Sequence, residues 1–95
     1  MAIYVLLSRI APDATADAGS FRQIADKVKK TIQKECPEVE WKSSYVTFGR
    51  FDVIDVFEAP SEREAQRVAM IIRRFGKATT ETMQAIPWDE FLSQM

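Results

Sequence analysis

The sequence predicts one α+β domain in which four strands and two helices follow one another in the order β-α-β-β-α-β. Three observations lead to this prediction. Two stretches repeat apolar residues at helical spacing and begin with a helix-capping pattern. Four other stretches have strand length and are rich in β-branched and aromatic residues. The pair Gly49-Arg50 separates the middle two strands, as a tight hairpin turn would.

The composition is that of a single small globular domain spanning residues 1–95. Thirteen basic and fourteen acidic residues give a net charge of -1, which argues against binding to nucleic acids or anionic membranes. One cysteine excludes an intrachain disulfide and fits a reducing compartment. The apolar start is short and runs into Arg9, so it indicates a strand rather than a signal peptide, and no apolar run approaches the ~20 residues of a membrane span. We expect a cytoplasmic protein.

The first half of the chain predicts a strand and a helix. Residues 3–9 are apolar on both faces, which suits a central strand, and residues 10–19 form a loop of small, turn-favouring residues. Ser20 and Gln23 make a capping box, so the helix should begin there, and Pro37 should end it near residue 35. Its apolar stripe consists of Phe21, Ile24, Ala25, Val28 and Ile32.

The second half predicts a hairpin, a helix and a strand. Strands at 40–48 and 51–58 flank a type II′ turn with Gly49 at its first central position. A second capping box at Ser61 and Glu64 opens the next helix, and Gly76 is expected as its left-handed stop. The last strand covers residues 78–86. A tail, PWDEFLSQM, places Trp88, Phe91, Leu92 and Met95 on one helical face. This order predicts a ferredoxin-like sandwich, a four-stranded antiparallel sheet with two helices on one face.

The segment 45–86 resembles the GYD-domain family. It contains T-x-G-R-F-D-V-I, then E-A-P, a helix, a glycine and T-E-T-M-Q-A, and the Gly-Tyr-Asp motif takes the form Gly49-Arg50-Phe51-Asp52. Ile3-Tyr4-Val5 adds a weaker match. The chain departs from the family pattern in its longer IAPDATADAG loop and in Asp55, where the family is small and apolar. The resemblance implies a ferredoxin-like fold of the dimeric α+β barrel type, and no established activity.

The register of the hairpin determines which side chains of the middle two strands share a face of the sheet. With Phe48 opposite Phe51, Asp55 lies opposite Ser44 and diagonal to Lys42. An ionised carboxylate beneath packed helices would cost several kcal/mol, so we expect this face to point away from the helices. It carries Phe48, Phe51, Val46, Val53, Ser44, Asp55, Lys42 and Phe57.

An apolar face of this kind is expected to be covered by another protein surface. With Tyr4 and Leu6 of the first strand, its phenylalanines and Val53 would form an apolar patch larger than soluble monomers usually expose. We therefore expect a homodimer, or a larger even homo-oligomer, with two sheets facing each other around a cavity.

Asp55 is the candidate catalytic residue. In a closed cavity desolvation would raise its pKa and suit it to act as a general base, whereas an ion pair with Lys42 would make it structural. The candidate ligand-binding residues are Tyr4, Ser8, Lys42, Ser44 and Phe51. Tyr4, Ser8 and Ser44 would supply polar contacts and Phe51 a stacking wall, although simple packing at an interface is the favoured role for each of them.

Structural roles are the favoured interpretation of the remaining reactive residues. The chain has no histidine, so histidine-based triads and most zinc sites are excluded. Cys36, before a proline, is interpreted as a half-buried filler rather than a nucleophile. Asp52 should hydrogen-bond Thr47 across the hairpin. Asp52, Glu58 and Glu81 could contact a hard cation, but their spacing favours solvated carboxylates, and we expect neither a metal nor a cofactor.

Two functions are consistent with this sequence. The first is binding of a small organic molecule between the sheets of a dimer, with or without cofactor-independent proton transfer on a small acid or aromatic compound by Asp55 or Tyr4. The alternative is a non-catalytic ligand-sensing or oligomerisation module. RNA binding by the strand aromatics is disfavoured because no basic sheet face accompanies them.

Overall fold

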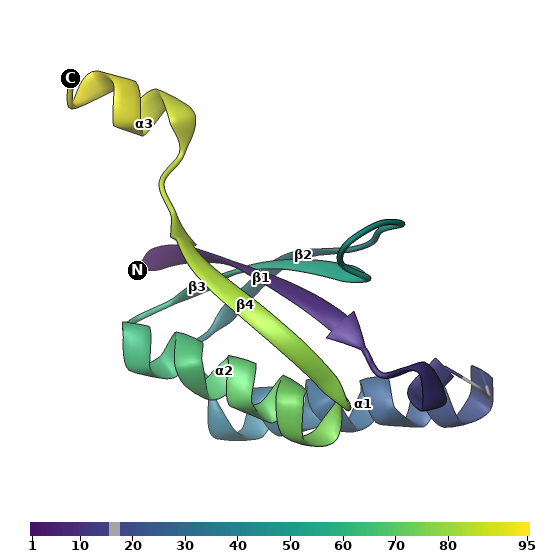
Figure 1. Ribbon diagram of the computed structural model, residues 1–95. Coiled ribbons are helices and arrows are strands. Elements are labelled where there is room, and N and C mark those ends of the chain that lie inside the picture. The colour runs from purple at the N-terminus through teal and green to yellow at the C-terminus, as the bar shows by residue number, and fades with distance from the viewer. Residues whose placement is uncertain (16–17) are drawn as a thin grey trace.

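The fold is a four-stranded sheet with two long helices beneath it and a short helix set apart from both (Figure 1). The computed structural model describes residues 1–15 and 18–95. The strands are β1 (Ala2–Ile10), β2 (Glu40–Val46), β3 (Val53–Ala59) and β4 (Ala78–Ala85), and the helices are the 3-10 helix η1 (Pro12–Thr15), α1 (Ala18–Glu35), α2 (Glu62–Phe75) and α3 (Trp88–Ser93).

The sheet has the strand order β2-β3-β1-β4, and neighbouring strands are antiparallel. The two central strands β1 and β3 are therefore adjacent, and each is followed by a helix that crosses beneath the sheet to an edge strand (Figure 1). This is the ferredoxin-like β-α-β-β-α-β sandwich, so the predicted fold class is confirmed.

The hairpin register is as predicted near the turn and shifts further along. Val46 pairs with Val53, Ser44 with Asp55 and Ser43 with Val56. Lys42 is then an extra residue, a β-bulge, so that Trp41 rather than Lys42 pairs with Phe57. The bulge moves Trp41 to the Asp55 face.

The turn itself is wider than predicted. Both strands stop short of it, and the hydrogen bond closing the ladder runs from the Thr47 N–H to the Asp52 carbonyl. Gly49 has a φ of +146°, which favours glycine but is far from the value of about +60° that a type II′ turn requires there. The type II′ assignment is therefore wrong.

The predicted orientation of the sheet is also wrong. Phe57 is fully buried and Asp55 is only 7% exposed. Phe57 packs in one core cluster with Tyr4 and Leu6 of β1 and with Val68 of α2, so this face lies beneath the helices. The residues that line the opposite, open face include Val5, Leu7, Ile54, Val56 and Met83.

The reason is that α1 is not packed closely over Asp55. A carboxylate sealed under packed helices would cost several kcal/mol, which is why the sequence favours the opposite orientation. In the structure Asp55 borders an open cleft below β2 and β3 and accepts a hydrogen bond from Ser44. Burial of Phe57, Leu6 and Tyr4 then decides the orientation, since each large apolar side chain contributes about 1.5–3 kcal/mol.

The helix termini agree with the sequence only in part. Ser61 caps α2 as predicted, because its hydroxyl accepts the Glu64 N–H at 3.2 Å. α1 begins at Ala18, so Ser20 lies inside the helix and is not its N-cap; residues 16–17 of the predicted loop lie outside the described residues. Gly76 ends α2 in a right-handed conformation, and it is Lys77 that has a positive φ, +51°.

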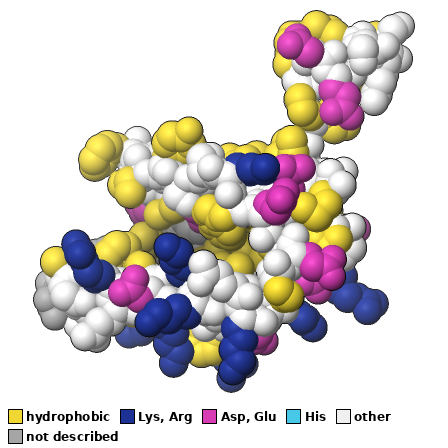
Figure 2. Space-filling model, turned by 180° about the vertical axis from the view of Figure 1, so that it is seen from behind, with side chains coloured by type: hydrophobic (Ala, Val, Ile, Leu, Met, Phe, Trp, Pro, Cys, Tyr) yellow, Lys and Arg dark blue, Asp and Glu magenta, His cyan; other side chains and the backbone are white. Residues whose placement is uncertain are grey.

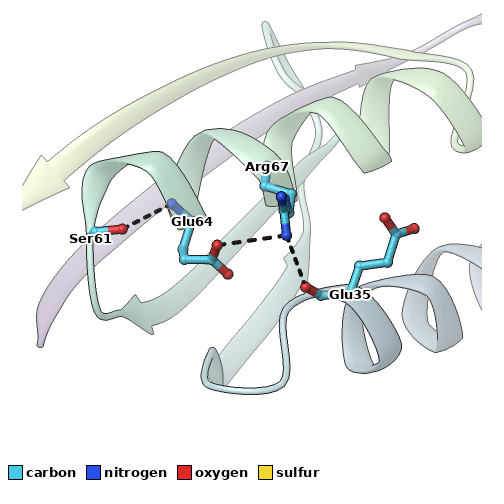
Figure 3. Close-up of polar contacts among 4 residues, drawn as sticks. All are labelled: Glu35, Ser61, Glu64 and Arg67. Atoms are coloured by element: carbon cyan, nitrogen blue, oxygen red, sulfur yellow. Dashed lines mark hydrogen bonds and ion pairs between the residues drawn. The ribbon is translucent and has the colours of Figure 1, made fainter.

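A polar clamp joins the end of α1 to the beginning of α2 (Figure 3). The Arg67 guanidinium donates a hydrogen bond to the Glu35 carbonyl at 3.3 Å and lies 3.8 Å from the Glu64 carboxylate. Ile32, close to this clamp, is the buried residue of α1. The C-terminal end of α1 is thus fixed to α2, and the cleft is bordered by residues along the helix from Phe21 to Gln33.

Lys77 provides a test of the α2 terminus. Lys77→Gly should raise the free energy of unfolding by about 1 kcal/mol, since a left-handed conformation costs roughly that much for a residue with a Cβ. Thermal or urea unfolding measures it. Lys77→Ala, which keeps the Cβ and loses the same charge, should show no comparable gain; an equal gain in both variants would contradict the assignment.

Candidate functional site

A cleft of about 770 Å³ opens between the sheet and α1. Figure 2 shows the hollow between the two layers, with hydrophobic side chains in its depth and basic side chains gathered along the helical rim. The sheet contributes Ser8, Trp41, Ser44, Val53 and Asp55. The helical side is contributed mainly by Phe21, Ile24, Ala25, Val28, Lys29 and Gln33 of α1.

The cleft exists because the apolar stripe of α1 stays away from the sheet. Phe21, Ile24 and Val28 are only half-buried, whereas α2 buries four residues of its own stripe. A stripe of this kind normally packs against a sheet. Here it forms one wall of an apolar hollow whose volume falls within the range of small-molecule sites.

Three side chains form a hydrogen-bonded chain in the sheet wall of the cleft. The Trp41 indole N–H donates to the Ser44 hydroxyl at 2.8 Å, and that hydroxyl donates to Asp55 Oδ1 at 2.6 Å. The bulge at Lys42 makes this possible, since it moves Trp41 to the same face as Ser44. Trp41 also stacks on Phe57 with ring centres 5.2 Å apart, which fixes the indole.

Ser8 adds a second polar group to the same wall. Its side chain is buried, and within the described residues its hydroxyl has no hydrogen-bond partner. A buried hydroxyl without a partner costs about 1–3 kcal/mol. Because Ser8 lines the cleft, a bound molecule could provide the missing hydrogen bond.

The environment of Asp55 changes its acidity. Desolvation by the apolar walls raises the pKa of its carboxyl, and the hydrogen bond from Ser44 opposes this only in part. A carboxyl with a raised pKa that borders a cleft is a typical candidate for a functional group.

The structure brings together three of the six predicted site residues. Asp55, Ser8 and Ser44 line the cleft. Tyr4 is buried in the core and stacks on Phe57, with ring centres 5.9 Å apart.

Lys42 and Phe51 lie elsewhere. Lys42 forms an ion pair with Glu58 at 2.8 Å, so the predicted Lys42–Asp55 pair is wrong. The bulge is the cause, because it takes Lys42 out of the alternation that would have placed it near Asp55. Phe51 borders a separate hollow of about 210 Å³ together with Arg9 and Arg50.

Two other residues have the structural roles that the sequence favours. Cys36 is buried, and desolvation, assisted by Glu64, raises the pKa of its thiol, which disfavours the nucleophilic thiolate. Asp52 also has a structural role at the hairpin, but with a different partner from the one predicted. Its carboxylate accepts the Ile10 N–H at 2.8 Å. The Thr47 hydroxyl donates to the Phe51 carbonyl and not to Asp52.

Residues 1–15 and 18–95 contain no group of three or more histidine, cysteine or acidic side chains placed to hold a metal ion. In the same part of the chain, no helix is both long enough and apolar enough to cross a membrane.

The family model of the GYD domain matches residues 4–95, almost the whole chain. The protein belongs to the GYD-domain family. Comparison with curated proteins finds no significant match.

Solved structures similar to this GYD-domain protein share its fold. The hypothetical protein PHS023 from Pyrococcus horikoshii is 27% identical, with a TM-score of 0.57 and 92% of each chain covered. FFRP-DM1 is also 27% identical, with a TM-score of 0.54, covering 90% of this chain and 100% of its own. The de novo designed protein LFR1 1, titled as having a ferredoxin fold, is 14% identical with a TM-score of 0.54, covering 92% of this chain and 86% of its own.

Trp41 and the helical wall of the cleft are not predicted by the sequence. Trp41 could have been placed there only by assuming a bulge at Lys42, for which the opposite charge of Glu58 on the next strand is an indirect signal. No pattern in the sequence distinguishes an apolar stripe that packs from one that lines a cleft.

The raised pKa of Asp55 predicts how stability depends on pH. Well below the ordinary aspartate pKa of about 3.9, the carboxyl is protonated in both folded and unfolded chains and its burial costs nothing extra. As pH rises through the raised folded pKa, ionisation favours the unfolded chain, so wild-type stability should fall relative to that of Asp55→Asn. Thermal unfolding between pH 3 and 8 measures this difference. A wild type that gains stability over Asp55→Asn with rising pH would contradict the environment described for Asp55.

Proposed function

We propose that this GYD-domain protein binds a small, mainly apolar molecule in the cleft between α1 and the sheet, with Asp55 at the polar end of the site. The observation that supports this most is the position of Asp55, a buried carboxyl with a raised pKa in the wall of an apolar hollow. Burial of such a group lowers the free energy of unfolding. A ligand that forms a hydrogen bond with the group would restore part of that loss.

The polar groups of the cleft define the chemistry of the ligand. Ser44 directs its hydrogen to Oδ1 of Asp55, which leaves Oδ2 as the acceptor for a ligand. A hydroxyl or amino group on the ligand would donate to this oxygen. The Ser8 hydroxyl can complete the same polar end, either as donor or as acceptor.

The helical wall favours an anionic group at the other end of the ligand. Lys29 lines the cleft from α1, and neither it nor Gln33 is buried. A ligand with a hydroxyl at one end, an aromatic or aliphatic body and a carboxylate at the other end would therefore fit this site. The hydroxyl would bind Asp55, the body would contact the apolar walls, and the carboxylate would lie near Lys29. This is a small hydroxylated organic acid.

A second candidate function is proton transfer on the bound molecule. The raised pKa of Asp55 favours it, since a carboxylate that takes up a proton at less acidic pH is a stronger base. The Ser44 hydroxyl and the Trp41 indole would hold the carboxylate in one orientation. A loss of turnover in Asp55→Asn that is much larger than its loss of ligand affinity would distinguish catalysis from binding alone.

Competition for a fluorescent probe tests the binding proposal. Anilinonaphthalene sulfonate, an apolar anion, would report occupancy of the cleft by energy transfer from Trp41. We expect 4-(4-hydroxyphenyl)butyrate to displace it about tenfold more effectively than 4-phenylbutyrate, because a hydrogen bond to a charged group contributes about 1.5–3 kcal/mol. In Asp55→Asn this preference for the hydroxyl should largely disappear.

A matched pair of variants locates the site. Ala25 lines the cleft and is exposed, so Ala25→Phe should fill the cleft and abolish probe binding. Gln23→Phe adds the same ring to the same helix at an exposed position that does not line the cleft, and should leave binding intact. Equal binding by both variants, or a hydroxyl preference that survives in Asp55→Asn, would refute the proposal.

A further inference from the structure

The two long helices carry a positive charge that the net charge of the chain conceals. α1 and α2 together contain nine of the thirteen basic residues and four of the fourteen acidic ones, which gives them a net charge of +5. The rest of the chain, with four basic and ten acidic residues, carries -6. All nine basic residues of the helices are exposed, and basic side chains cover the helical layer in Figure 2. Within residues 1–15 and 18–95, Arg67 alone among the nine forms an ion pair, with Glu64 at 3.8 Å.

Six of these residues form two rows on the side of the helices that faces away from the sheet. In each helix they recur at helical spacing, opposite to the side chains that line the cleft or pack in the core. The rows are Lys27, Lys30 and Lys34 in α1 and Arg63, Arg67 and Arg74 in α2. We call these six residues the basic face.

Contacts at both ends hold the two rows beside each other. At one end, Lys27 Nζ and the Arg74 guanidinium lie 5.0 and 5.2 Å from the centre of the Phe75 ring. At the other end, the Arg67 guanidinium donates to the Glu35 carbonyl (Figure 3). The helices therefore run antiparallel, and the charges of one row reinforce those of the other. Such a concentration of uncompensated charge attracts an extended anionic partner.

The shape of the basic face suits a flat partner better than a nucleic acid. Helix axes in contact lie about 8–10 Å apart, so two helices side by side are too wide for the DNA major groove, which is about 12 Å across and admits one helix. The Phe75 ring is covered by two cations and is not free to stack on a base. Met70, 59% exposed, lies between Arg67 and Arg74 along α2, and an apolar side chain at that place suits the boundary between lipid head groups and acyl chains.

We propose that the basic face binds the surface of a bilayer that contains anionic phospholipids. The lysine and arginine side chains contact the head groups, Met70 enters the head-group layer, and the acidic remainder of the chain faces water. The net charge of the whole chain, from which the sequence disfavours such binding, averages a positive layer with a negative one. Each basic residue near the bilayer contributes about fivefold to the affinity. The contact is peripheral and does not use the polar groups of the cleft.

Co-sedimentation with vesicles tests the proposal. At about 0.1 M salt, wild type should sediment with vesicles of phosphatidylserine and phosphatidylcholine in equal amounts and stay in solution with phosphatidylcholine alone. Lys30→Gln with Lys34→Gln should weaken binding about 25-fold, because two head-group contacts are lost. Lys42→Gln with Arg50→Gln removes the same charge from exposed positions on the sheet and hairpin, and should bind as wild type does. Lys30→Arg with Lys34→Arg keeps the charge and should keep the binding.

Three results would overturn the proposal. The first is a wild type that does not sediment with the anionic vesicles. The second is an equal loss of binding in the two glutamine double variants, which would show that net charge and not the basic face is responsible. The third is tighter binding to a DNA duplex than to the vesicles, measured by fluorescence anisotropy at the same salt concentration, which would show that the partner is a nucleic acid.

Discussion

The period of two along the central strands is the constraint on which the rest of the structure depends. Phe57 and Asp55 are two residues apart in β3, so they must lie on the same face of the sheet. Tyr4 and Leu6 pair with them from β1. Once the aromatic and aliphatic residues of this set pack beneath the helices, Asp55 is carried there too. The combined gain from burying three large side chains exceeds the several kcal/mol that one partly solvated, hydrogen-bonded carboxyl costs.

The opening of the cleft follows from how α1 is attached. Arg67 holds the end of α1 to α2 through the Glu35 carbonyl, while the earlier turns of the helix leave room above their apolar stripe. Asp55 therefore borders an accessible hollow instead of a sealed core. The sheet consequently has two distinct surfaces: a cleft with a polar end on the helical side, and a flat apolar face on the other.

The sequence was sufficient to predict the order of elements and the pairing of Ser44 with Asp55, because apolar periodicity, strand alternation and the Ser61 cap act over a few positions. It was not sufficient to orient the sheet, since both faces of β3 are apolar and the decision depended on how closely α1 packs. The bulge at Lys42 was missed for a similar reason. It is stabilised by contacts made only after folding, the Lys42–Glu58 ion pair and the Trp41–Phe57 stack.

Asp55 lies beneath the helices in the wall of an apolar cleft. This position can be tested by titrating its side-chain carboxyl carbon, followed by carbon-13 NMR on the assigned wild-type protein. We expect a midpoint clearly above the ordinary aspartate value, because desolvation outweighs the hydrogen bond from Ser44. A midpoint at or below the ordinary value would contradict it, since that is the behaviour of a solvated or ion-paired aspartate on an open face.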